Sequence, residues 1–513
     1  MRALSASVVL SSIALGSWLG GAAAQSVDPA IPAAQNPAPD ELAGGSENLP
    51  PGIIPEPSVD SPGVVLGVTL GELYTDNLML APSGKPKQTS WITEIQPFIK
   101  SAYSGPRLSG VFDYTLTGYL YQGQSRHNQL AHNLDTHGTL TLLPQHFFLD
   151  GSALYGREVV NSELPAGSGT FFLDNNRANV TRATLSPYWI QDLGNVGSAL
   201  LRYSYGRVLY DTKGIPAQSN DLLIGVSDIT SNALQFNFAS PKYQTWSWNF
   251  GYVDQRIKFG SGRNSRFSIA KLGAAVQVRD NVSLLADVGK ENKFLADGTV
   301  DRLGASFWDT GVEWSNALND FKVLVGHRFY GRSYQLSWTR TAALLTTTAS
   351  YVERPTDLNQ QLLGQGTDAT PSLGFPVIPS LREQRVYLMK RATVSAAYEM
   401  PKGALRVTLY DERRNFFLLN SGRERVTNAE VAWLFKIGPL TTLTPTYVWQ
   451  RYRYRDGKIN YGQYAQLDLV HQLDPKNFAS LRLRRYSRRV HAVSPGANGY
   501  RANVAFLQFT HLF

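Results

Sequence analysis

Apolar and polar side chains alternate with a period of two from Val64 to the C-terminus, in segments of about ten to sixteen residues. In the clearest segment, one face carries Leu108, Gly110, Phe112, Tyr114, Leu116, Gly118 and Leu120, and the other carries Ser109, Val111, Asp113, Thr115, Thr117, Tyr119 and Tyr121. The same contrast recurs at residues 321–330, 386–400 and 405–414. A strand of a membrane β-barrel needs an apolar face toward lipid and a polar face toward the lumen. The alternation therefore predicts transmembrane strands.

The connections between these segments alternate in length. Short ones, rich in Pro, Gly, Asn and Asp, lie at residues 104–106, 144–145, 194–195, 280–281, 401–403, 438–439 and 474–476. Long ones lie at residues 75–88, 123–133, 160–177, 212–220, 355–383 and 492–499. Short periplasmic turns and long outer loops are typical of outer-membrane barrels. We predict an all-β, antiparallel, up-and-down barrel of about 22 strands, with about 18 as the lower bound. Residues 320–345 are the least clear part, because their connections are very short.

The last predicted strand, residues 504–513, places Ala505, Leu507, Phe509, His511 and Phe513 on one face. This pattern resembles the C-terminal insertion signal that the barrel assembly machinery recognises. Phe509 and Phe513 are the candidate signal residues, whereas His511 departs from the usual bulky apolar side chain. Closure of the barrel requires this strand to pair with the first one, at residues 64–74.

The N-terminus has the three parts of a secretory signal. Arg2 supplies the positive charge, residues 8–19 are apolar, and Ala22, Ala23 and Ala24 form a small-residue cleavage site. Residues 25–63 are rich in Pro and Ala and contain acidic residues without Lys or Arg, so we expect a disordered periplasmic segment. The predicted organisation is a signal peptide at 1–24, this segment at 25–63 and a barrel at 64–513. An exported barrel belongs in the bacterial outer membrane.

Composition narrows the chemistry. The chain has no Cys, which excludes disulfides and Cys-ligated zinc, and its 8 His are scattered. No nucleophile elbow, phosphate-binding loop, HExxH or EF-hand loop is present. We therefore expect no catalytic residues, no cofactor and no metal, although a barrel-embedded hydrolase stays open as an alternative. The pI of about 9.4 would be consistent with nucleic-acid binding, but the predicted signal peptide argues against this function.

Charged residues on the predicted inner face are candidates for lining the pore: Asp113, Asp135, Asp287, Glu291, Asp309, Glu313, Arg391, Arg406, Arg414, Arg482, Arg484 and Arg488. Either they form a charged conduit for a polar solute, or they are solvated and mutually paired. The aromatic and basic residues at 447–455 similarly fit two functions. They suit an interfacial girdle whose Arg side chains reach lipopolysaccharide phosphates, and they also suit stacking against sugar rings.

Several strings resemble a family of outer-membrane β-barrel porins encoded with exosortase-type (PEP-CTERM) exopolysaccharide loci. The strings are Tyr74-Thr75-Asp76-Asn77 with Pro97, Asp113-Tyr114 with residues 119–121, residues 144–150, residues 327–338 with Tyr351, and residues 410–414. The resemblance implies a porin-like component of capsule or exopolysaccharide export, with polysaccharide as substrate and a periplasmic polysaccharide-export protein as partner. No catalytic residue carries over. We interpret residues 327–338 as a structural hairpin, with a gate as the alternative.

The leading hypothesis is therefore an outer-membrane conduit for a polysaccharide, and the alternative is a general or solute-specific diffusion porin. A TonB-dependent receptor does not fit, because only residues 25–63 precede the first strand and such receptors carry a folded plug domain. A wide barrel without a plug would leak. We therefore predict that the long loop at residues 355–383 folds inward as a constriction.

Overall fold

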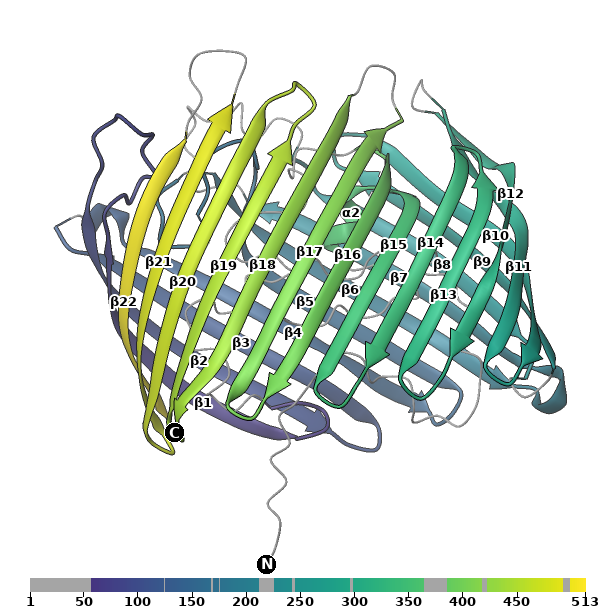
Figure 1. Cartoon of the computed structure of the whole chain (residues 1–513), viewed down its shortest axis with the longest axis horizontal. Coiled ribbons are helices and arrows are strands. Elements are labelled where there is room, and N and C mark those ends of the chain that lie inside the picture. Colours follow the sequence, from purple (N-terminus) through teal and green to yellow (C-terminus); the bar gives the residue numbers. More distant parts are fainter. Residues whose placement is uncertain are drawn as a thin grey trace, which may run out of the picture.

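Twenty-two antiparallel strands form one closed barrel in the computed structural model (Figure 1). The structure describes residues 57–513 apart from 124, 168, 175, 212–225, 242–244, 296–298, 364–384, 418–421 and 492–498. The predicted signal peptide and most of the segment at 25–63 lie outside the described residues. The predicted fold class is confirmed, and so is the count of 22 strands.

The barrel has two unlike ends. The short turns and the C-terminus lie at one end (Figure 1), which in outer-membrane barrels faces the periplasm. The strands that run away from this end are β1 (Gly63–Thr75), β3 (Leu108–Tyr121), β5 (Phe147–Val159), β7 (Ser198–Asp211), β9 (Trp246–Phe259), β11 (Val282–Phe294), β13 (Asn319–Arg328), β15 (Leu345–Thr356), β17 (Gly403–Phe416), β19 (Thr441–Arg453) and β21 (Asn477–His491). Those that return are β2 (Ser90–Ser104), β4 (Gln129–Leu143), β6 (Arg177–Asp192), β8 (Ile229–Ala239), β10 (Asn264–Arg279), β12 (Val300–Ser315), β14 (Gly331–Thr341), β16 (Tyr387–Met400), β18 (Arg423–Gly438), β20 (Ile459–Asp474) and β22 (Tyr500–Leu512). The short helices are η1 (Ser125–His127), η2 (Gly194–Val196) and α2 (Leu358–Leu362).

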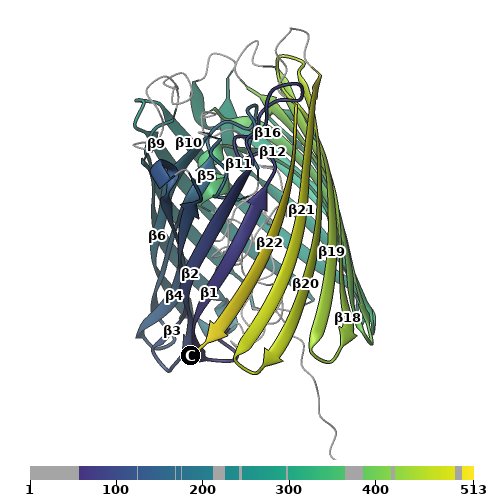
Figure 2. The same ribbon diagram turned by 90° about the vertical axis from the view of Figure 1, so that its left-hand side faces the viewer.

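The first and last strands close the barrel, as the sequence predicts. β1 pairs with β22 in an antiparallel register that runs from Gly67 opposite Leu512 to Thr75 opposite Val504 (Figure 2). The hydroxyls of Thr69 and Thr510 meet across this seam at 2.8 Å. Closure gives each of the 22 strands a hydrogen-bonded neighbour on both sides, so the sheet has no edge strand of the kind that a membrane would not tolerate.

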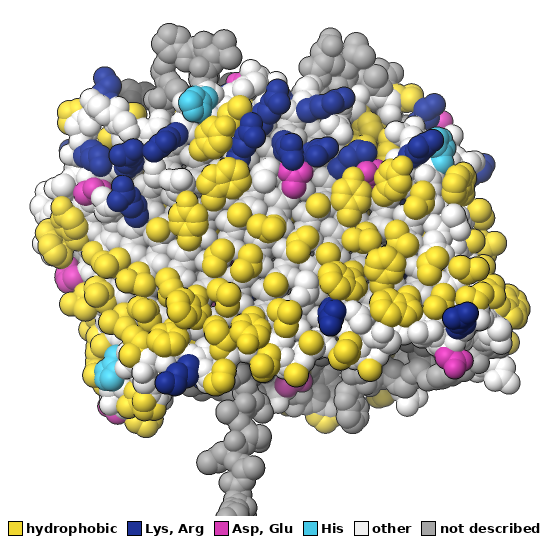
Figure 3. Space-filling model, viewed as in Figure 1, with side chains coloured by type: hydrophobic (Ala, Val, Ile, Leu, Met, Phe, Trp, Pro, Cys, Tyr) yellow, Lys and Arg dark blue, Asp and Glu magenta, His cyan; other side chains and the backbone are white. Residues whose placement is uncertain are grey.

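An apolar belt surrounds the outside of the barrel. Figure 3 shows it as a broad band across the strands, with basic side chains along its outer margin. The predicted lipid face of β3 is confirmed, because Leu108, Phe112 and Leu120 are exposed on the outside. Thr115 and Tyr119, from the opposite face, are buried. A closed barrel with such a belt has the architecture of an outer-membrane protein.

No helix among the described residues is long and apolar enough to cross a membrane.

The structure corrects some strand limits. Residues 129–133, placed by the sequence in an outer loop, already belong to β4, because polar side chains there face the lumen. The last strand begins at Tyr500 rather than Val504. Residues 327–338, interpreted as a structural hairpin, lie in the hairpin of β13 and β14. Its tight connection depends on Gly331, whose φ of 110° is disfavoured for other residues.

Candidate functional site in the barrel lumen

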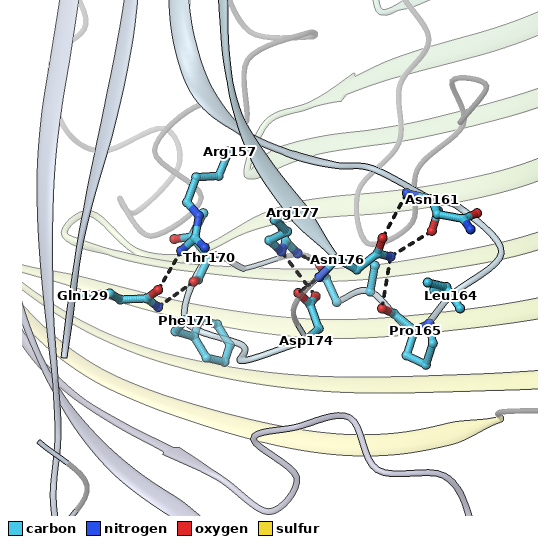
Figure 4. Close-up of polar contacts among 12 residues, drawn as sticks. Gln129, Arg157, Asn161, Leu164, Pro165, Thr170, Phe171, Asp174, Asn176 and Arg177 are labelled. Carbon is cyan, nitrogen blue, oxygen red and sulfur yellow. Dashed lines mark hydrogen bonds and ion pairs between the residues drawn. The ribbon is translucent and has the colours of Figure 1, made fainter. Parts of the chain in front are cut away.

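The connection between β5 and β6, residues 160–176, folds into the barrel, and we call it the inward loop (Figure 4). The sequence placed it among the outer loops. Its rings Phe171 and Phe172 are almost fully buried. Phe171 packs edge-on against Phe506 of β22 at 5.6 Å between ring centroids, and Phe172 packs against Tyr486 of β21 at 5.5 Å. Strands β1 to β4 lie between β5 and β22 in the barrel wall, so the inward loop reaches a distant part of the wall.

Hydrogen bonds hold the inward loop to this part of the wall. The Arg488 guanidinium donates to three successive carbonyls of the loop, those of Ser162 at 3.2 Å, Glu163 at 2.6 Å and Leu164. The Tyr500 hydroxyl donates to the carbonyl of Ala166 at 2.6 Å. Bonds from a charged donor are stronger than neutral ones, so Arg488 is the principal polar anchor.

The inward loop also has internal supports, shown in Figure 4. At its base the Asn176 amide donates to the Asn161 carbonyl at 2.8 Å and accepts from the Asn161 backbone N–H at 3.0 Å. Arg177 pairs with Asp174 at 3.3 Å. Nearer the tip, the Gln129 amide of β4 donates to the Thr170 carbonyl at 2.8 Å. These bonds satisfy polar groups that leave bulk water, so the loop has a defined shape.

A second segment enters the lumen from the opposite side. Residues 356–363, including α2, follow β15 and reach the inner face of β7 and β9. The Gln360 amide donates to the Gln255 side chain of β9 at 2.8 Å. Leu363 lies so close to Gly206 of β7 that a Cβ at this glycine would collide with it. Val160 at the start of the inward loop belongs to the same hydrophobic cluster as Leu363. The two segments therefore share one apolar support on this wall.

This second segment is the described part of the loop at residues 355–383, which the sequence predicts to fold inward as a constriction, and the described part does turn inward. Residues 364–383 lie outside the described part of the chain. Asp357 is the N-cap residue of α2, and its carboxylate accepts the Gln360 backbone N–H at 3.0 Å. Burial raises the pKa of Asp357 to about 7, although hydrogen bonds from the Gln360 and Asn359 backbone and the Ser265 hydroxyl lower it.

The attachment of the second segment should therefore depend on pH. A carboxyl whose pKa is raised in the folded state stabilises that state fully below its ordinary pKa, near 4, and this advantage is lost as pH rises toward about 7. We expect attachment to weaken by up to about tenfold per pH unit across this window. Because the chain has no Cys, Leu363→Cys would supply a single thiol. Its labelling by a methanethiosulfonate reagent, relative to denatured protein at each pH, should accelerate from pH 5 to pH 7.

The matched control is Asp357→Asn in the same background, because Asn keeps the capping oxygen and cannot titrate. Its relative labelling rate should stay flat over the same window. A pH response of equal size in both proteins would contradict the assignment to Asp357.

The twelve candidate pore-lining residues all lie on the inner face by strand alternation. Most of them contact a partner. Asp113 meets Lys100 at 3.1 Å, and Asp287 meets Lys271 at 3.4 Å. Further contacts join Glu291 and Asp309 to Arg328, Arg391 and Arg414 to Glu412, Arg482 to Asp468, Arg484 to Gln466, Arg488 to the inward loop, and Asp135 to His137. Glu313 is partly exposed and lies opposite Lys322, and Arg406 is exposed. Mutual pairing therefore describes most of these charges better than a row of free charges.

Sequence reasoning missed several residues that complete these groups. Arg328 bonds both Glu291 at 2.8 Å and Asp309 at 2.6 Å. Glu412 is fully buried between Arg391, at 2.6 Å, and Arg414. Glu412 could have been found from the sequence, because it lies two positions before Arg414 and so shares its strand face. The contacts of Arg328 could not have been found in this way, because they depend on the register of β11, β12 and β13, which the sequence does not reveal.

The aromatic and basic stretch at 447–455 divides between the two faces. Tyr447, Arg451 and Arg453 are exposed on the outside, whereas Tyr452 and Tyr454 are buried on the inside. The outward members occupy the place that the girdle interpretation requires.

Among the described residues, no group of three or more His, Cys, Asp or Glu side chains is placed to hold a metal ion.

Comparison with known proteins finds low similarity. No protein-family model matches the chain, and no curated protein matches it. Among solved structures, the FrpB iron transporter from Neisseria meningitidis (F5-1 variant) is 12% identical with a TM-score of 0.47, covering 88% of this chain and 82% of that one. The siderophore receptor PirA from Pseudomonas aeruginosa is 9% identical with a TM-score of 0.39, covering 88% and 80%. The siderophore receptor PirA from Acinetobacter baumannii is 8% identical with a TM-score of 0.44, covering 87% and 80%. Values this low support no conclusion about cargo or mechanism.

Proposed function

We propose that this protein is a transport conduit of the bacterial outer membrane and that its cargo is a polysaccharide bound for the cell surface. The observation that carries the proposal is the pair of segments inside the barrel. The inward loop reaches the wall at β21 and β22, and residues 356–363 reach the wall at β7 and β9. A barrel of this size encloses a wide water-filled space, which a conduit must narrow when no cargo is present.

The wall beneath the inward loop suits sugar recognition. Tyr464 and Tyr486 lie 5.1 Å apart between ring centroids, and the loop ring Phe172 covers Tyr486. Beside them, Arg484 donates to the Gln466 side chain at 2.7 Å. Aromatic faces next to guanidinium and amide groups bind sugar rings and acidic substituents. Displacement of the loop would uncover this surface along the path of a threading polymer. The resemblance to polysaccharide-export porins supports the same cargo.

The polysaccharide cargo can be tested in the native bacterium by deleting the gene. Polymer on the cell surface should fall to background while polymer inside the envelope persists, because synthesis does not depend on the conduit. Both pools would be measured with a polymer-specific stain or antibody after fractionation. Restoration by the wild-type gene is the control for polar effects. Normal surface polymer in the deletion strain would overturn the polysaccharide proposal.

A diffusion porin is the second candidate, because a loop fixed to the wall also gives a pore a permanent constriction. The two functions differ in a liposome swelling assay with the purified protein alone. Passage of small neutral sugars at a steady rate would favour the porin, whereas a barrel closed at rest would pass little until the inward loop is removed.

A further inference from the structure

A row of arginines crosses the outside of the barrel at its outer end. Arg413 of β17 lies directly opposite Arg425 of β18, and Arg425 lies directly opposite Arg453 of β19. The side chains of Arg413 and Arg425 are 58% and 50% exposed. Adjacent strands are about 4.8 Å apart, so the row spans about 10 Å. We call these three residues the arginine row.

Charge balance within the row is incomplete. Like charges directly opposite each other on neighbouring strands repel and are destabilising. Among the described residues, one carboxylate contacts the row: Asp411 accepts from Arg425 at 2.7 Å and lies 3.5 Å from Arg413. Further exposed arginines extend the positive surface across β19 to β22, namely Arg451, Arg485, Arg489 and Arg501. The surface therefore fits a ligand that brings negative charge.

The arginine row lies at the margin of the apolar belt. Leu409 of β17, Val431 of β18 and Tyr447 of β19 are exposed on the same outer faces, nearer the middle of the barrel. Figure 3 shows the basic side chains gathered along the outer edge of this belt. Basic side chains at this depth reach the headgroup layer while the apolar residues beside them contact acyl chains.

We propose that the arginine row is a binding site for the phosphate groups of a glycolipid in the outer leaflet, of the kind that anchors lipopolysaccharide. Guanidinium groups bind phosphate oxygens in pairs of parallel hydrogen bonds. Asp411 orients Arg425 and Arg413, and the phosphates supply the remaining negative charge. The acyl chains of the same molecule lie along Leu409, Val431 and Tyr447. This site is independent of the conduit, because all these side chains point away from the lumen.

The test uses the full-length purified barrel in detergent and bisphosphorylated lipid A as the probe. Native mass spectrometry would count the lipid molecules retained as lipid A is added. The triple variant Arg413→Gln, Arg425→Gln, Arg453→Gln should bind at least about tenfold more weakly, because it loses the charged donors. The wild-type protein should bind enzymatically dephosphorylated lipid A, and phosphatidylglycerol, with a similarly large loss.

The matched control is Arg340→Gln, because Arg340 is exposed on β14 near the periplasmic end of the barrel. It should bind lipid A as the wild type does. Resistance of the folded barrel to SDS at room temperature would confirm that each variant is folded. If the triple variant does not fold, Arg425→Gln alone serves, with a smaller loss. Unchanged binding by the folded triple variant would overturn the proposal, and so would equal wild-type binding of dephosphorylated lipid A or phosphatidylglycerol.

Discussion

Replacement of residues 161–175 by an Asn-Gly turn is expected to raise the single-channel conductance of the purified barrel by about twofold or more, because it removes the inward loop from the conducting cross-section. The ends of the loop allow this change. Val159 and Arg177 are cross-strand partners, and the Val160 N–H donates to the Asn176 carbonyl at 2.9 Å. A two-residue turn therefore closes the hairpin without moving β5 or β6. Planar-bilayer recordings in a symmetric salt solution would measure the change.

Two point variants test whether the inward loop obstructs the pore while leaving the loop in place. Arg488→Gln removes the charged donor that holds three loop carbonyls, so the inward loop should detach more often and the current should fluctuate between two levels. Arg489→Gln is the matched control, because Arg489 is the next residue of β21 and its exposed side chain points outward. Conductance equal to wild type in the loop replacement would show that the inward loop does not obstruct the pore.

Removal of the Glu412 carboxylate is expected to destabilise the barrel by roughly 3–5 kcal/mol, the usual cost of leaving buried charges without their partner. Glu412 is fully buried and accepts hydrogen bonds from Arg391 at 2.8 Å, from Arg414 and from the Tyr410 hydroxyl. Glu412→Leu keeps similar volume but removes the carboxylate that lies between two buried guanidinium groups, while Arg414 keeps its contacts with Glu424 at 3.5 Å and with the Tyr452 hydroxyl at 2.7 Å. The free energy of unfolding would be measured by denaturant titration of the protein folded in detergent micelles.

The neighbouring residue provides the control. Asp411 also pairs with arginines, but it lies on the outside of the same strand and is partly exposed. Asp411→Asn should therefore cost less than about 1 kcal/mol, because water screens exposed ion pairs. A second substitution, Arg391→Met, in the Glu412→Leu protein should recover part of the lost stability, since it removes a buried guanidinium group that has lost its contact with the Glu412 carboxylate. Equal losses for Glu412→Leu and Asp411→Asn would contradict the role given to burial.

The barrel wall could be predicted from the local alternation of apolar and polar residues along the chain. A strand has two faces and these strands meet two different environments, so alternation alone reveals which side chains contact lipid. Leu108 and Phe112 on one face of β3, and Thr115 on the other, lie where the pattern places them. Strand order also follows, because consecutive strands joined by short turns pair with each other. The least clear stretch, residues 320–345, was ambiguous because the β13–β14 turn has only two residues between the strands.

The segments that fold into the lumen could not be predicted from local sequence patterns, because they are held by contacts between residues far apart in the chain. The inward loop meets Phe506 and Tyr486, which are more than three hundred residues away along the chain. Its composition resembles that of any outer loop, so the sequence could not show that Phe171 and Phe172 would find an aromatic surface inside the barrel. The prediction that the segment at 355–383 turns inward is confirmed as far as Leu363, and it rests on the length of the segment and on the need to narrow a wide barrel.

The amino-acid sequence by itself therefore determined a closed membrane barrel, its lipid-facing side chains, its closing seam and the inner position of the twelve candidate pore-lining charges, because each depends on a repeat of two residues. Tertiary structure alone decided which charges pair, since pairing depends on strand register that sets Arg328 between Glu291 and Asp309. It also decided which loops enter the lumen. A loop turns inward only where the far wall offers partners for its backbone carbonyls and apolar rings, as Arg488 and Phe506 do here.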